Sequence, residues 1–202
     1  MSASQPKAWK EAPVDTESRT GRAPRGPLIG AVFGAGWFLV GLGALHGSAR
    51  AVAAAAGALI LVAVTFAVLR PGRRPAPAPA APGPPRGRAF VRLLVVQAVL
   101  LGVGAGIINS RLHAHQLVFS WAALVVGGHF FPLARILGAP LLRVLGAVMA
   151  GVVALTAATA LAAPDTTPWI WQALPGLGCA GALWAAVLAT GAGTRARTPR
   201  NA

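Results

Sequence analysis

The chain has 202 residues, of which 55% are hydrophobic and only 11% are Asp, Glu, Lys or Arg. A water-soluble domain of this size needs more charge on its surface, so the composition excludes an ordinary soluble fold and favours lipid as the surrounding medium. The net charge of +14 would suggest nucleic acid as the partner of a soluble protein, but the basic residues cluster between apolar stretches. That placement indicates a topology signal and contact with anionic lipid headgroups, and we expect no nucleic-acid binding.

The chain begins with 26 mostly polar residues. This segment is too long and too acidic for the start of a signal peptide, so we expect a disordered cytoplasmic tail over 1–26 and a first span that is retained. Six apolar stretches follow, each long enough to cross about 30 Å of hydrocarbon as a helix. The predicted spans are 27–45, 51–69, 89–110, 117–136, 141–163 and 169–191.

These stretches do not alternate polar with apolar residues, so the pattern predicts an all-α, polytopic transmembrane bundle and not a barrel. Short connections join spans one to two, three to four and five to six, which gives three antiparallel hairpins. An inverted arrangement of three plus three helices stays open. The domain is expected to cover 27–193.

Spans two and three are separated by residues 70–88, which are rich in Pro and Arg. Closely spaced prolines prevent a helix and favour an extended conformation, so we predict a basic cytoplasmic linker along the inner leaflet. A protein that reads Pro-rich sequence could also bind there. Residues 194–202 are expected to form a cytoplasmic tail.

Orientation follows from the basic residues, because Lys and Arg are retained on the cytoplasmic side. With the amino terminus inside, sixteen of the 18 Lys and Arg residues fall in inner segments. Only Arg50 and Arg111 fall in outer loops. Trp121, Trp169 and Trp171 lie at the outer ends of spans, where an indole ring can sit in the interface with its N–H in contact with water. Both signals predict cytoplasmic termini.

The four acidic residues all lie outside the predicted spans, which argues against a proton- or sodium-coupled carrier that depends on an intramembrane carboxylate. His129 is the one ionisable residue deep inside a span, and Gln97 lies at nearly the same depth in the preceding span. Antiparallel packing about His113 would bring both side chains level, so we predict that they form an intramembrane polar pair. Gly104, on the face of Gln97, would allow the two helices to approach closely, as would Gly102 with Gly106 on the adjoining stripe.

Two interpretations of this pair stay open. It could be a structural clamp that fixes the register of spans three and four, since polar groups in hydrocarbon need partners. It could also be a relay for a proton or a substrate.

The outer loops contain His46, His113 and His115, and the His113-x-His115 pair could in principle contribute to a metal or haem site. It lacks a carboxylate or thiolate partner, so we interpret these histidines as solvated residues or headgroup contacts. Cys179 is the only cysteine, which excludes a disulfide within the chain. We expect no metal, no cofactor and no catalytic residue.

Span four ends in Gly-Gly-His-Phe-Phe-Pro-Leu-Ala-Arg, residues 127–135, and Arg143 follows after a short turn. Pro132 removes a backbone donor and should kink the inner end of this helix. Arg135 and Arg143 can reach lipid phosphates or a protein partner. The segment resembles one found in small, uncharacterised multi-pass bacterial membrane proteins, with the likeness confined to the region of span four. The resemblance implies a polytopic membrane fold and carries no catalytic role.

Sixteen Arg against two Lys, with abundant Ala, Gly and Pro, is typical of a GC-rich bacterial genome and therefore indicates the bacterial plasma membrane. We expect a non-enzymatic integral membrane protein with a structural or accessory role, either as a homo-oligomer or with a partner membrane protein. The competing hypothesis is a small transporter or permease with its polar site at His129 and Gln97. A membrane-embedded enzyme or haem protein is the third.

Overall fold

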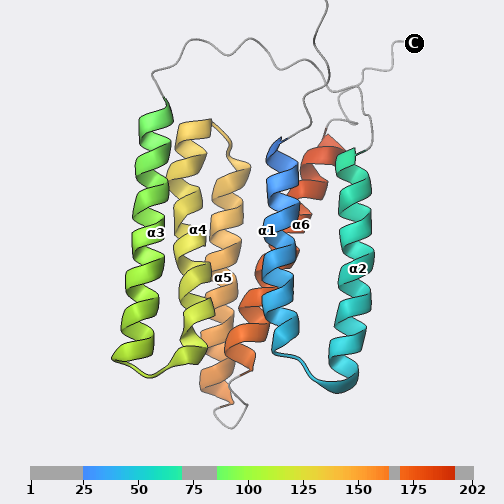
Figure 1. Ribbon diagram of the computed structural model, residues 1–202. Helices are drawn as coiled ribbons and strands as arrows, with labels where there is room; N and C mark the ends of the chain where they lie inside the picture. Colours follow the sequence, from blue (N-terminus) through green and yellow to red (C-terminus); the bar gives the residue numbers. More distant parts are fainter. Residues whose placement is uncertain (1–24, 70–85, 164–168, 194–202) are drawn as a thin grey trace, which may run out of the picture.

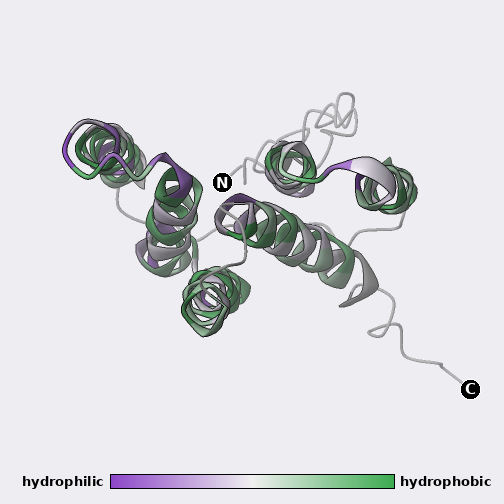
Figure 2. Ribbon diagram, turned by 90° about the horizontal axis from the view of Figure 1, so that it is seen from below, coloured by the Kyte–Doolittle hydropathy of each residue, from purple (hydrophilic) through white to green (hydrophobic). Residues whose placement is uncertain are grey.

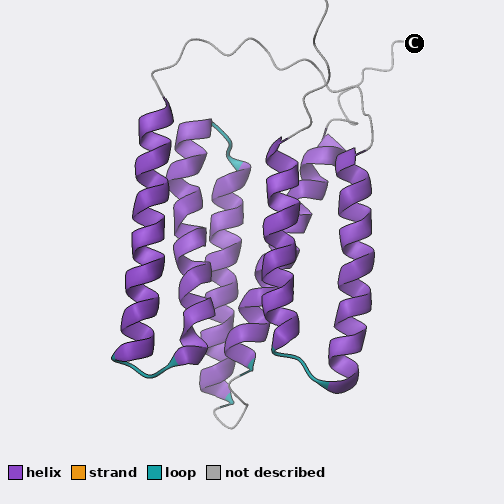
Figure 3. Ribbon diagram, viewed as in Figure 1, coloured by secondary structure: helices purple, strands orange, loops and turns teal. Residues whose placement is uncertain are grey.

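The computed structural model describes residues 25–69, 86–163 and 169–193, which form helices and short connections without a strand in these ranges (Figure 3). The elements in chain order are α1 (Arg25–Gly43), α2 (Gly47–Leu69), α3 (Arg86–Ser110), the short 3-10 helix η1 (His115–Leu117), α4 (Val118–Leu137), α5 (Leu141–Ala162) and α6 (Ile170–Gly193). The predicted all-α class is confirmed.

All six α-helices are long and apolar enough to cross a membrane, with spans of 18 to 24 residues. The most apolar is α2, whose span has a mean hydropathy of 2.6. A helix satisfies its backbone N–H and C=O groups internally, and this is what allows such a segment to lie in hydrocarbon. The six predicted spans therefore correspond to six observed helices.

The helix bounds differ from the predicted spans where a helix continues into polar sequence. α3 begins at Arg86, directly after Pro85, so the predicted linker ends three residues earlier than residue 88. α1 begins at Arg25 and α2 at Gly47, each before its predicted span. Hydropathy marks only the part of a helix that hydrocarbon covers, whereas helical hydrogen bonds continue into the headgroup region, where Arg side chains stay hydrated. The predicted tail and linker segments 1–24, 70–85 and 194–202 lie outside the described residues.

The helices pair as three hairpins, α1 with α2, α3 with α4 and α5 with α6 (Figure 1). α6 lies in the centre, where it contacts α1, α2, α4 and α5. Seen along the helices, α1 and α2 lie on one side of α6, and α3 to α5 lie on the other (Figure 2). α3 therefore does not pack with α1 and α2. The first three helices do not form a separate three-helix half of the kind that a three-plus-three arrangement suggests.

The contact between α1 and α6 forms the centre of the bundle, and glycines bring the two backbones together. A Cβ atom on Gly176 would meet the backbone of Gly41, and one on Gly41 would lie 2.7 Å from the backbone nitrogen of Leu177. Further along the same pair of helices, Gly34 makes room for the indole of Trp184. This large ring is 3% exposed, and its Nε1–H donates to the Ala31 carbonyl oxygen at 3.2 Å.

The second buried cluster joins α4, α5 and α6 through Ala123, Met149 and Cys179, each of which is fully buried. Gly127 and Gly146 allow α4 and α5 to approach, since a Cβ on Gly146 would lie 2.6 Å from the Gly127 carbonyl oxygen.

α3 is the least buried of the six helices. Only 6% of its span is buried, compared with 44% for α6. Among the described elements, α3 contacts only α4 and η1.

The arginines are segregated between the two ends of the bundle. Of the eight in the described ranges, six lie at or near the end that carries the α4–α5 turn (Figure 1): Arg25, Arg86, Arg88, Arg92, Arg135 and Arg143. Arg50 and Arg111 lie at the opposite end. All four acidic residues fall outside the described ranges, so the described part of the chain contains no carboxylate side chain that could pair with an arginine.

Candidate functional site: a groove between α3 and α4

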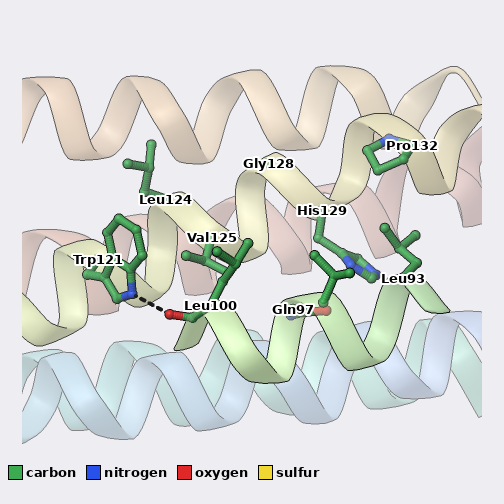
Figure 4. Close-up of a pocket in the computed structure, with 10 residues that line it drawn as sticks. Leu93, Gln97, Leu100, Trp121, Leu124, Val125, Gly128, His129 and Pro132 are labelled. Atoms are coloured by element: carbon green, nitrogen blue, oxygen red, sulfur yellow. Dashed lines mark hydrogen bonds between the residues drawn. The ribbon is translucent and has the colours of Figure 1, made fainter. Parts of the chain in front are cut away.

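A groove of about 350 Å³ follows the seam between α3 and α4 (Figure 4). Its lining residues all come from these two helices: Leu93, Val96, Gln97, Leu100, Trp121, Leu124, Val125, Gly128, His129 and Pro132. Val96 and Leu124 are 53% and 44% exposed, so the groove opens onto the surface of the bundle. Its volume is at the lower end of the range for small-molecule sites.

His129 and Gln97 both line this groove, from α4 and α3 respectively, and their side chains converge in the close-up (Figure 4). The antiparallel hairpin therefore places them level, as their spacing from the turn predicts. The hydrogen bonds of the described residues do not include one between them, so the predicted pairing stays a prediction. Nδ1 of His129 is buried and lacks a hydrogen-bond partner within the described part of the chain.

Trp121 closes the groove at the end nearer η1. Its ring lies over Gly104, where a Cβ atom would overlap the indole, and its Nε1–H donates to the Leu100 carbonyl oxygen at 3.1 Å. The sequence placed Trp121 at the outer interface with its N–H in water, whereas the structure gives that N–H a backbone partner on the neighbouring helix. The glycine seven residues after Gln97 was the available signal for this contact.

Gly104 thus makes room for the Trp121 ring, whereas the predicted close approach of the two backbones stays a prediction, and Gly102 and Gly106 have no comparable contact. A Cβ atom on either of these two would have open space around it. Both glycines are exposed on α3. They lie on the part of α3 that α4 does not cover.

Pro132 lies inside α4, which continues to Leu137 and ends at Gly138 with a left-handed φ of 65°. Arg135 lies seven residues after Gly128 and so continues the groove-lining stripe of α4 towards the arginine-rich end. Arg92 on α3 lies one turn before the lining residue Val96. Arg135, Arg92 and Arg143 are all exposed, and the contact of Arg135 and Arg143 with lipid phosphates or a partner stays a prediction.

The histidines of the predicted outer loops do not assemble into a metal site in the described ranges, where His, Cys, Asp and Glu form no group of three. Nδ1 of His115 lies 2.8 Å from Oδ1 of Asn109, a hydrogen bond that holds the start of η1 to the end of α3. His113 is exposed and has a positive φ of 49°, which marks it as a turn residue. His46 is exposed near the start of α2.

The described residues form six apolar helices that include a tightly packed α1–α6 pair, with six of the eight described arginines near one end, and this arrangement defines a multi-pass α-helical membrane protein. Comparison with known proteins adds no family to this class: no protein-family model matches the chain, and neither a curated protein nor a solved structure shows significant similarity to it.

Proposed function

We propose that this protein is a non-enzymatic accessory subunit of the bacterial plasma membrane that associates laterally with another membrane protein or with a second copy through α3. The observation that carries the proposal is the exposure of α3, of whose span only 6% is buried. A helix so weakly attached to its own bundle has most of its surface available for a neighbour. The predicted resemblance of residues 127–135 to a segment of small bacterial membrane proteins agrees with a location in the bacterial plasma membrane, and this resemblance stays a prediction.

The uncovered face of α3 has the residues that helix association in lipid requires. Ala98, Gly102 and Gly106 repeat every four residues and are exposed, and the surroundings of both glycines are open. Since lipid tails are as apolar as Leu, helices associate in membranes by close packing, and small residues at this spacing allow it. Val95 and Val99 flank the stripe and are more than half exposed.

The competing function, a small transporter or permease, is supported by the polar groups of His129 and Gln97 in mid-span. Transport through a single chain needs a path for a polar substrate between the two sides of the membrane. The groove that contains this pair is walled mainly by apolar side chains and opens onto the surface of the bundle. This location favours an accessory role.

Site-specific photo-crosslinking in intact cells tests the accessory role. A photoreactive residue at Val99 is expected to give one protein adduct of defined mass, and an adduct of twice the chain mass identifies a second copy. The control is the same residue at Leu155, which is 57% exposed on α5 and should react mainly with lipid. If Val99 and Leu155 give the same lipid-only products, α3 is not an association surface.

We further propose that both termini and the Pro-rich linker are cytoplasmic, on the basis of six arginines near one end of the bundle and two near the other. Cys179 is buried, so a single cysteine added elsewhere can be labelled selectively with a membrane-impermeant maleimide. Ser48→Cys, at the start of α2, should react in intact cells. Ala78→Cys, in the linker, should react only after lysis, and the reverse pattern would invert the topology.

A further inference from the structure

We propose that the groove between α3 and α4 binds a neutral, lipid-soluble quinone, whose carbonyl oxygen accepts hydrogen bonds from His129 and Gln97. This site does not depend on the accessory role proposed above. It follows from three properties of the groove: two polar side chains without a hydrogen-bond partner among the described residues, their depth in the membrane, and the apolar character of the surrounding walls.

The first property concerns hydrogen bonding. Nδ1 of His129 is buried without a partner in the described ranges, while the side chain as a whole is partly exposed and lines the groove. The ring therefore presents its other nitrogen, Nε2, to the groove. We assign the imidazole proton to Nε2, because a buried Nδ1–H without an acceptor would be costlier than a buried lone pair. The Nε2–H group is then a hydrogen-bond donor that faces the groove.

Gln97 faces the same groove, and no hydrogen bond of its amide is found among the described residues, so its NH₂ group is a second donor at the same level. A polar group left facing hydrocarbon costs several kcal/mol, since neither water nor lipid tails can pair with it. A single carbonyl oxygen has two lone pairs and can accept from both donors. A carbonyl oxygen at this level therefore pairs with the Nε2–H of His129 and one amide N–H of Gln97.

Depth decides which molecule can supply that carbonyl. His129 and Gln97 each lie within about 5 Å of the middle of their helices at 1.5 Å of rise per residue. The ester groups of a phospholipid lie at the edge of the hydrocarbon, roughly 10 Å further out, so they do not reach this pair. An acyl chain reaches it but carries no acceptor. The head group of a quinone is neutral and apolar enough to enter hydrocarbon, and it carries its carbonyl oxygens with it.

The walls fit the rest of such a molecule. Leu93, Val96 and Val125 provide apolar surface for the ring and for the first part of its tail. The volume of about 350 Å³ accommodates a substituted ring, and the opening of the groove lets the tail continue into lipid. None of the described residues that line the groove is charged, which selects a neutral head group over an anionic one.

Binding is tested with a decyl-substituted benzoquinone added to the purified full chain in mild detergent. Trp121 lines the groove, so the bound quinone should quench tryptophan fluorescence saturably. His129→Leu and Gln97→Leu should each weaken binding about tenfold, the ordinary effect of removing one hydrogen bond in a dry site. His46→Leu, between α1 and α2, and Gln116→Leu, in η1, make the same replacements at exposed positions outside the groove and should leave the affinity unchanged.

A photoreactive quinone provides a second readout that is independent of the variants. Its adducts are expected on peptides from α3 and α4, and excess decyl-benzoquinone should suppress them. Linear, unsaturable quenching that is equal in the wild type and both groove variants would overturn the proposal. Adducts that spread over all six helices would overturn it as well.

Discussion

Gly176→Ala is expected to lower the free energy of unfolding by roughly 3 kcal/mol, the upper range for an overpacked contact. The added methyl group would meet the backbone of Gly41, which cannot rotate away as a side chain could. α1 and α6 must then separate, and the contact between them is the centre of the bundle. Helix propensity acts in the opposite direction, because Ala is favoured over Gly by about 1 kcal/mol in a helix.

The matched control for this change is Gly181→Ala, on the same helix. A Cβ atom at Gly181 meets nothing within 4 Å, so only the propensity term acts, and stability should stay the same or rise slightly. Unfolding can be followed with a thiol-reactive dye, since Cys179 is the only cysteine and is buried until the bundle opens. Equal melting temperatures for the two variants would contradict the close contact between Gly176 and Gly41.

Trp184→Ala is expected to cost about 3–5 kcal/mol, the usual loss for a buried aromatic side chain. The indole packs against Phe38, with ring centroids 5.4 Å apart, and lies in a cluster with Val64, Val68 and Val187. Its removal leaves a cavity where α1, α2 and α6 meet. It also removes the hydrogen bond to the Ala31 carbonyl.

Trp169→Ala provides the comparison, because Trp169 is 43% exposed at the start of α6 and has less packing to lose. The same dye reaction at Cys179 reports both variants. We expect a clear drop in melting temperature for Trp184→Ala and little change for Trp169→Ala. If Trp169→Ala unfolds at the lower temperature, the packing of α6 against α1 and α2 is not what stabilises this part of the bundle.

The groove could be anticipated only in part. The spacing of Gln97 and His129 about the turn placed them level, and Gly104 indicated where two helices could approach. The sequence did not indicate that Trp121 would occupy the space above Gly104 and donate to Leu100. A tryptophan near a helix end suits both an interface position and an interhelical contact, and only the packing of α3 on α4 distinguishes them.

The role of the small residues shows the same limit. The pairs Gly30 with Gly34 and Gly102 with Gly106 have the same spacing, yet the first packs against Val187 and Trp184 of α6 and the second remains open. Spacing fixes which residues share a helix face, but not which neighbour that face meets. The neighbour depends on how all six helices pack.

The sequence by itself determined the all-α class, the six spans, the three hairpins and the segregation of arginines, because hydrocarbon length and backbone hydrogen bonding are local requirements. The tertiary structure decided that α6 lies at the centre, that α3 contacts only α4 and η1 among the described elements, and that a groove runs beside His129 and Gln97. These features arise from contacts between residues far apart in the chain. An apolar helix is equally soluble in lipid on every face, so hydropathy cannot distinguish the buried faces from the exposed ones.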